Sequence, residues 1–244
     1  PDDCPGLQSD KLNDAGRALV EFVIICNAIF DSKIADRIQL VHHLPHRRRL
    51  NEVAAGKIDV SGSTIFPEAA QTLAVQSPPL ISDAAIRVNE FEKAIFTVPG
   101  RDDVLAVRSL EALRKFKAVI VKYWVVDVKT LNAMKLKAVV KVTKPDLYAR
   151  FMEDGRADFV ISEFNTATNR PWGKKMVRVP GVKISLISPR IFLVSPQRSD
   201  ILQAINTYLE KSRAGENDLI KSAFRKAAFF KPEFSNWKLL FPVN

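Results

Sequence analysis

Apolar and polar positions alternate at helical spacing in two stretches of the chain, and each stretch closes on the same short motif. The stretches cover residues 49–60 and 148–160. In each, an amphipathic run is followed by Gly56 or Gly155, two further residues, Asp59 or Asp158, and an apolar strand start. Glycine suits the left-handed cap that ends a helix. One helix–turn–strand piece in each half predicts two similar α/β lobes with a cleft between them.

The same periodicity predicts elements along the rest of the chain. Helices are expected at Asp14–Phe30, in the run ending at Gly56, at Ser109–Leu113, up to Met134, in the run ending at Gly155, at Asp200–Arg213 and at Asn217–Lys226. Strands or extended runs are expected at Ile38–Val41, Ile58–Ser61, Ala85–Val88, Lys93–Val98, Ala118–Val121, Ala138–Val142, Phe159–Ser162, Ile184–Ile187 and Ile191–Ser195. Strands that alternate with helices predict parallel sheets built from β-α-β units.

The composition allows a sizeable core, since 47% of the 244 residues are hydrophobic. The longest apolar run, Ala18–Cys26, is interrupted by Glu21 and is shorter than the roughly 18–20 residues of a membrane span, so it predicts a core helix. The chain opens abruptly at Pro1. A removed leader and a first strand that lies outside the given sequence explain this opening equally well.

The net charge of +10 is unevenly distributed. Residues 95–190 hold 19 Lys/Arg against 9 Asp/Glu, and the rest of the chain is balanced. Such an excess is typical of a solvated face, or of a surface that meets an anionic ligand or partner. The basic residues are spread without a dense arginine tract or a nucleic-acid-binding motif, so we expect no nucleic-acid partner.

The two cysteines and three histidines carry less information. Cys4 and Cys26 either form a disulfide that pins the N-terminal segment or remain free thiols, and their spacing excludes a Cys-x-x-Cys site. His42 and His43 point to opposite faces of an extended segment, so together with His46 they predict a polar loop rather than a metal site. One arginine of the adjacent run 47–49 could reach a bound anion.

Several short motifs, taken in order, resemble those of one protein family. They are Gly56–Val60, Gly62–Glu68, Ser77–Leu80, Ser109–Leu113, Gly155–Ile161 and a closing segment with Phe229, Phe230 and Trp237. Over nearly all of the chain, their order resembles the type II periplasmic binding proteins. It is most similar to the solute-binding protein family 3 branch, the extracellular solute-binding proteins of the ABC-transporter type.

The resemblance implies a two-lobe α/β fold in which each lobe is a mainly parallel sheet flanked by helices. Lobe 1 would combine residues 1–90 and 192–244, and lobe 2 would hold residues 95–188. The lobes would be joined by a two-segment hinge at residues 84–98 and 189–195. A small solute would bind between the lobes and be delivered to a membrane transporter.

The resemblance also implies which residues to examine, and here the chain departs from the family's amino-acid binders. Those proteins carry Thr-x-Thr-x-Glu-Arg, whose arginine clamps the ligand carboxylate. In this chain Phe66 takes the second hydroxyl position and Ala69 the arginine position. An α-amino acid held in the usual way is therefore not expected. The candidate ligand-binding residues are Thr64, Phe66, Glu68, Ser77, Lys122, Tyr123, Trp124, Glu163 and Phe164.

Two functions follow from these residues. The first is an extracytoplasmic, periplasmic protein that captures a small anionic or aromatic ligand against aromatic walls. The second is a signalling or docking protein, either ligand-independent or ligand-sensing, that has a degenerate cleft and binds a membrane receptor. No hydrolase elbow, metalloprotease motif or nucleotide loop is present, so an enzyme is not expected. We expect a monomer without cofactor or metal.

Overall fold

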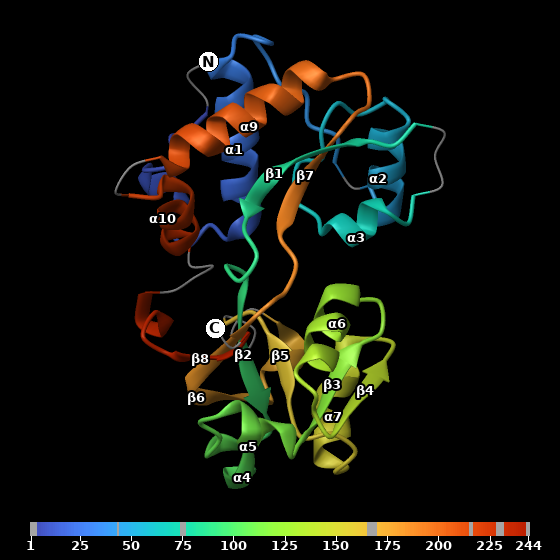
Figure 1. Cartoon of the computed structure of the whole chain (residues 1–244), viewed down its shortest axis with the longest axis vertical. Coiled ribbons are helices and arrows are strands. Elements are labelled where there is room, and N and C mark those ends of the chain that lie inside the picture. Colours follow the sequence, from blue (N-terminus) through green and yellow to red (C-terminus); the bar gives the residue numbers. More distant parts are fainter. Residues whose placement is uncertain are drawn as a thin grey trace. The chain divides into compact units, whose positions relative to one another are not determined.

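The computed structural model describes residues 4–42, 44–73, 77–164, 170–214, 217–227 and 232–242 (Figure 1). The chain divides into two compact units. The first unit comprises Pro1–Arg87 and Pro189–Phe229, and the second comprises Val88–Ser188 and Phe230–Asn244. No helix among the described residues is long and apolar enough to cross a membrane.

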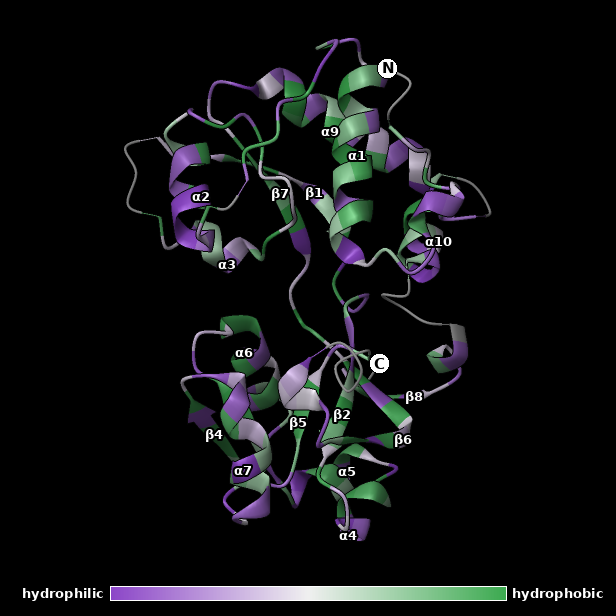
Figure 2. Cartoon of the chain, turned by 180° about the vertical axis from the view of Figure 1, so that it is seen from behind, coloured by the Kyte–Doolittle hydropathy of each residue, from purple (hydrophilic) through white to green (hydrophobic). Residues whose placement is uncertain are grey.

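The first unit is built around one long apolar helix, α1 (Arg17–Asp31). Its buried side chains include Val20, Val23 and Ile24, and Figure 2 shows that it is mostly hydrophobic, whereas α2 (His46–Ala54) is mostly hydrophilic. Helix α1 packs against α9 (Ser199–Arg213), which also contacts the strand β1 (Leu80–Ile86). The remaining helices of this unit are η1 (Asp10–Leu12), α3 (Pro67–Ala70) and α10 (Leu219–Lys226). The disulfide Cys4–Cys26, one of the two predicted alternatives, ties the N-terminal segment to α1.

The strands of the first unit form a short antiparallel ladder. Strand β1 pairs with β7 (Arg190–Val194), and the preceding loop adds isolated bridges from Val60 to Val194 and from Ile65 to Ile191. The predicted strand Ile38–Val41 does not form, and the structure leaves this segment without regular secondary structure. Its side chains at Leu40 and Val41 are about half exposed, at 50% and 57%.

The two glycine motifs end helices as the sequence predicts. Gly56 follows α2 with φ +75°, and Gly155 follows α7 (Tyr148–Glu153) with φ +67°. Both values lie in the left-handed region that glycine adopts without steric cost. At Gly56 an added Cβ would also lie 2.3 Å from Oε1 of Gln197, so the end of the Gln197 side chain would have to shift to admit a larger residue.

The second unit contains the larger sheet. The strands of this unit are β2 (Glu92–Thr97), β3 (Lys117–Val121), β4 (Ala138–Val142), β5 (Val160–Ser162), β6 (Val177–Ser185) and β8 (Lys238–Phe241). Four strands follow the order β5-β2-β6-β8, and β3 pairs in parallel with β4. A parallel bridge from Ala118 to Phe159 joins these two groups. Helices of this unit are α4 (Asp102–Leu105), α5 (Leu110–Arg114), α6 (Val125–Ala133) and α7, with 3-10 turns η2 (Pro145–Leu147), η3 (Pro171–Gly173) and η4 (Pro232–Phe234).

The C-terminal segment lies in the second unit, which differs from the expected placing of all of residues 192–244 in lobe 1. Strand β8 pairs in parallel with β6. Beside it, Phe234 stacks on Phe164 with ring centroids 4.5 Å apart, and the buried Lys183 donates to the Phe234 carbonyl. Backbone pairing and aromatic burial therefore hold the tail on this sheet, which the chain order alone does not reveal.

Candidate functional site

The loop that carries Thr64 and Phe66 is fixed by the edge of β7. Ile65 exchanges two backbone hydrogen bonds with Ile191, of 2.8 and 2.9 Å. The Ser61 hydroxyl accepts a hydrogen bond from the Leu193 amide and donates one to the Ser63 carbonyl, so it links the turn to β7. These bonds leave Thr64 almost fully buried, at 2% exposure.

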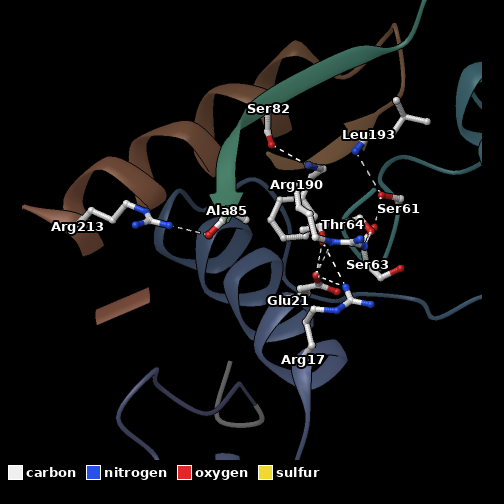
Figure 3. Close-up of polar contacts among 11 residues, drawn as sticks. Arg17, Glu21, Ser61, Ser63, Thr64, Ser82, Ala85, Arg190, Leu193 and Arg213 are labelled. Atoms are coloured by element: carbon white, nitrogen blue, oxygen red, sulfur yellow. Dashed lines mark hydrogen bonds and ion pairs between the residues drawn. The ribbon is translucent and has the colours of Figure 1, made fainter. Parts of the chain in front are cut away.

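Arg190, the first residue of β7, points its guanidinium into this loop (Figure 3). Its Nε donates to the Thr64 hydroxyl over 2.7 Å, and its Nη2 donates to the Thr64 carbonyl. The guanidinium also lies 4.6 Å from the centroid of the Phe66 ring, within the range of a cation–π contact. A guanidinium is thus present at the loop although position 69 lacks one.

A buried carboxylate lies beside the same threonine. Glu21, on α1, is fully buried and accepts hydrogen bonds from the Thr64 hydroxyl and from Nη1 of Arg17 (Figure 3). Its Oε1 is 3.9 Å from Nε of Arg190. Arg17 and Glu21 are four residues apart on α1, so helical spacing places them on one face.

A third arginine approaches from α2. The electrostatic field of both Glu21 and Arg17 reaches Arg49, whose Nη2 lies 3.2 Å from Nδ1 of His46. Burial lowers the pKa of Arg49, Glu21 opposes this shift and Arg17 adds to it. Burial also lowers the pKa of His46, and the positive charges of Arg49 and Arg190 lower it further. The charges of Glu21 and Arg17 thus both act on Arg49, and those of Arg49 and Arg190 both act on His46.

We call Arg17, Glu21, Arg49, Thr64 and Arg190 the arginine cluster. Its formal charge is three positive against one negative, which favours an anion. Within the described residues, Oε2 of Glu21 and Nε of Arg49 are buried and have no hydrogen-bond partner. Such atoms are costly unless something satisfies them. An acceptor near Nε of Arg49 and a donor near Oε2 of Glu21 would satisfy these two atoms.

Two further predicted residues of the first unit, Glu68 and Ser77, come later in the chain. Glu68 is half-buried in the first turn of α3, and Ser77 is exposed in the segment before β1. The face of the Phe66 ring, predicted as a wall for an aromatic ligand, already lies against Arg190. Position 69 is alanine, whose methyl side chain supplies no guanidinium.

In the second unit, the predicted residues 122–124 form the turn between β3 and α6. Lys122 and Tyr123 are exposed and lie against each other, with Nζ 4.9 Å from the ring centroid. Trp124 is half-buried and packs edge-on against the buried Tyr148, with ring centroids 6.4 Å apart. Trp124 is therefore part of a packed aromatic group, while its two neighbours face solvent.

A buried ion pair that sequence reasoning missed lies under this turn. Lys93 and Asp127 are 6% and 4% exposed and form a salt bridge, and Nζ of Lys93 is 5.5 Å from the centroid of Trp124. A buried pair of this kind is costly to break from one side, because the remaining charge is left without compensation. The ammonium group of this pair therefore lies against the ring of Trp124.

The last two predicted residues follow β5. Phe164 is 3% exposed and packs on Phe234 and Trp237, so its ring belongs to the core of the second unit. Its contact with a ligand stays a prediction. Glu163 is half-buried and forms no hydrogen bond or ion pair within the described part of the chain.

Sequence reasoning also missed Arg17, Glu21 and Arg190 as candidate site residues. One signal was present, since Glu21 is the single charge inside an otherwise apolar run. Arg190 gave no comparable signal, because it meets Thr64 only through a contact between residues 126 positions apart.

Comparison with known proteins rests on solved structures, since no family model and no curated protein matches this chain. It is similar to the probable amino-acid ABC transporter extracellular-binding protein ytmK from Bacillus subtilis, with TM-score 0.57 and 13% identity over 87% of this chain and 88% of that one. It is also similar to an ancestral arginine-binding protein bound to glutamine, with TM-score 0.51 and 18% identity over 84% and 86%.

A third similar structure is an ancestral amino acid-binding protein that is a precursor of cyclohexadienyl dehydratase. Its TM-score is 0.51 and its identity 17%, over 86% of this chain and 84% of that one. Identities this low establish the fold, and they leave the ligand to be argued from the residues of this chain. The fold of the chain is that of the type II periplasmic binding proteins.

Proposed function

We propose that the chain is an extracytoplasmic solute-binding protein whose first unit holds a small anionic solute at the arginine cluster. The observation that carries this proposal is the charge balance around Glu21, where Arg17, Arg49 and Arg190 outnumber one carboxylate. The fold supports it, because the similar solved structures are of binding proteins. A membrane transporter is the partner that this role requires.

The unsatisfied atoms of the cluster narrow the solute class. A carboxylate or phosphate of the solute would accept from the guanidinium groups, and charge-assisted bonds of this type are the strong ones. A hydroxyl or ammonium group of the solute would donate to Oε2 of Glu21, which lacks a partner within the described residues. Small hydroxy acids and acidic amino acids have both groups, whereas neutral amino acids bring no net negative charge to offset the cluster.

A thermal-shift screen tests the proposal. The panel holds hydroxy acids, dicarboxylates, phosphates, and acidic, neutral and basic amino acids, and each is measured on the wild type, Arg49→Gln and Arg47→Gln. Arg47 is a matched control because it lies on the same helix, is exposed and forms no ion pair among the described residues. We expect an acidic compound to raise the Tm of the wild type and of Arg47→Gln, and to act weakly on Arg49→Gln.

A second function, ligand-independent docking with a degenerate site, is favoured by one observation. Arg190 and Thr64 already bond to each other, and Arg190 covers the Phe66 ring. If no compound in the panel changes the Tm and a membrane protein is recovered in a pull-down without ligand, docking is the better account. Stabilisation by basic amino acids alone would contradict both functions as stated.

A further inference from the structure

Strands β3 and β4 of the second unit lie side by side, and the chain enters each of them through the same kind of tripeptide (Figure 1). The tripeptides are residues 115–117, Lys-Phe-Lys, and residues 135–137, Lys-Leu-Lys. The parallel register sets Lys117 beside Ala138, so the two tripeptides meet at one end of the strand pair. We call these six residues the basic end.

Hydrogen bonds hold the basic end in a fixed shape. The Lys137 amide donates to the Arg114 carbonyl over 2.8 Å, and Nε of Arg114 donates to the Met134 carbonyl over 2.9 Å. The ammonium group of Lys117 donates to the Gly155 carbonyl over 2.7 Å. The two tripeptides are therefore tied to each other and to the turn that follows α7.

The four lysines of the basic end carry charge that acidic residues do not offset. The lysines at 115, 135 and 137 are exposed, and none of the four forms an ion pair with another described residue. A lysine ammonium is a hydrated point charge and lacks the planar fork with which arginine fits one carboxylate. Four such charges favour a surface that bears many anions over one precisely placed anion.

Two acidic residues of the second unit come near these tripeptides, and both act on other groups. The Asp158 carboxylate accepts from the Arg101 guanidinium over 2.9 Å and from the Lys117 amide over 2.7 Å. Glu111 interacts electrostatically with Arg114, so we do not count that arginine with the lysines. The excess of positive charge at the basic end therefore comes from its lysine side chains.

Lys135 occupies a backbone position that suits glycine. It stands two residues after the end of α6 with φ +55°, in the left-handed region. Gly56 and Gly155 hold the corresponding positions after α2 and α7. A lysine is less favourable than glycine in this conformation, and strain of this kind is often found at functional positions.

We infer that the basic end is a docking surface for a membrane that contains anionic phospholipids. The ammonium groups would meet the lipid phosphates. Phe116 and Leu136, each half-buried between two lysines, would contact the boundary between headgroups and acyl chains. This pairing of apolar residues with lysines favours a bilayer over an acidic protein. Each lysine near an anionic bilayer contributes about fivefold in affinity, so binding is reversible and sensitive to salt.

The test measures sedimentation of the full chain with vesicles at about 0.1 M salt. One set of vesicles holds phosphatidylglycerol and phosphatidylcholine in equal parts, and the other holds phosphatidylcholine alone. The variants are Lys135→Gly and Lys33→Gly. Lys33 is a matched control, because it is exposed, follows α1 with the same φ of +55°, and belongs to the first unit. Each substitution removes one positive charge and places glycine where the backbone favours it.

We expect the wild type to bind the anionic vesicles and to leave the neutral ones unbound. Lys135→Gly should bind about fivefold more weakly, and Lys33→Gly should bind like the wild type. Both variants should keep or raise the Tm, so weaker binding is not a result of unfolding. The anionic vesicles should also protect the amides of residues 115–117 and 135–137 from hydrogen exchange.

Three results would overturn the inference. Equal weakening by Lys135→Gly and Lys33→Gly would show that only the net charge matters. Equal binding to both sets of vesicles, or no protection at the basic end, would exclude this surface as the contact.

Other anionic partners are separated by two further arms. If poly-glutamate protects the basic end and the vesicles do not, an acidic protein is the partner and the inference fails. If glycerol phosphate alone gives the same protection as the vesicles, the surface binds one soluble anion and the inference likewise fails. These outcomes do not depend on the arginine cluster, which belongs to the other unit.

Discussion

Replacing Glu21 by glutamine removes one negative charge from the centre of the arginine cluster and keeps the size of the side chain. The carboxylate is fully buried, accepts from the Thr64 hydroxyl and forms a salt bridge with Arg17. Glutamine retains an oxygen that can accept from Thr64. The guanidinium groups of Arg17, Arg49 and Arg190 would then repel one another without compensation.

The size of the effect follows from one distance. Oε1 of Glu21 lies 3.9 Å from Nε of Arg190. Two unit charges at that separation attract by about 4 kcal/mol at an effective dielectric constant of about 20. The substitution also removes the cost of burying a carboxylate, so we expect a net loss of about 3 kcal/mol in the free energy of unfolding, as for other buried pairs broken from one side.

The same change should strengthen anion binding. A solute carboxylate at about 6 Å from Glu21 would be repelled by about 3 kcal/mol at that dielectric constant, so removing the charge should increase affinity by roughly tenfold to a hundredfold. Glu21→Gln is thus expected to lower stability and to raise the response to phosphate or dicarboxylates. Opposite signs of this kind distinguish electrostatic repulsion from simple loss of packing.

The assay can separate the two units. All three tryptophans, at positions 124, 172 and 237, belong to the second unit, so their fluorescence reports on that unit during urea unfolding. Hydrogen exchange of α1 amides reports on the first unit. We expect Glu21→Gln to destabilise α1 and to leave the tryptophan transition unchanged. Glu52→Gln is the control, because within the described residues Glu52 pairs only with the exposed Lys57 and Arg48, at 3.5 and 3.6 Å, so the substitution should cost less than about 1 kcal/mol.

The reasoning would be refuted if Glu21→Gln and Glu52→Gln had equal effects on α1, since the cluster would then carry no special strain. It would also be refuted if Glu21→Gln weakened the response to anions. In that case Glu21 would act as an organiser of the site and not as a competitor for the guanidinium groups.

Three further predictions follow from other parts of the chain. Trp124→Ala should destabilise the second unit by about 3 kcal/mol in urea unfolding, because the ring packs on a buried aromatic partner, whereas Lys141→Ala, on an exposed side chain, should stay within about 0.5 kcal/mol; equal losses would contradict this. Replacing Cys4 and Cys26 by serine should cost about 3 kcal/mol, since the disulfide closes a loop of 22 residues, and an unchanged melting curve would count against it. The pKa of His46, followed by NMR, should lie below its usual value of about 6.5 and should rise when an anion binds. The free energy of unfolding should therefore fall as the pH drops below about 6.5, and should fall less when the anion is present. A pKa of His46 that does not change on saturation would contradict an anion near this residue.

The sequence predicted those elements whose signals are local. Helix α1 shows its apolar face within one run, and the left-handed glycines at 56 and 155 mark helix ends by their own backbone requirement. The sequence also predicts the helix N-cap at Ser109 from nearby residues, and the Ser109 side chain accepts a hydrogen bond from the Ala112 amide. Each of these features depends on residues a few positions apart.

Features that depend on distant partners were not predictable. The segment 38–41 has a strand pattern, but a strand needs a neighbour, and none of the described segments pairs with it. Residues 230–244 could not be assigned to a unit until β8 was seen on β6. The candidate site was the least predictable part, because Arg190 meets Thr64 only once the chain is folded, while the motif itself has alanine at position 69.

The central claim is that the arginine cluster holds a small anionic solute, and calorimetry tests it most directly. Small hydroxy acids, dicarboxylates, phosphates and amino acids are titrated into the wild type and into Arg190→Met, first at low salt and then at high salt. We predict that at least one acidic compound binds the wild type with micromolar affinity, more weakly at high salt, and that Arg190→Met loses this binding. Binding of neutral or basic compounds alone, or of an acidic compound equally by both proteins, would contradict the account.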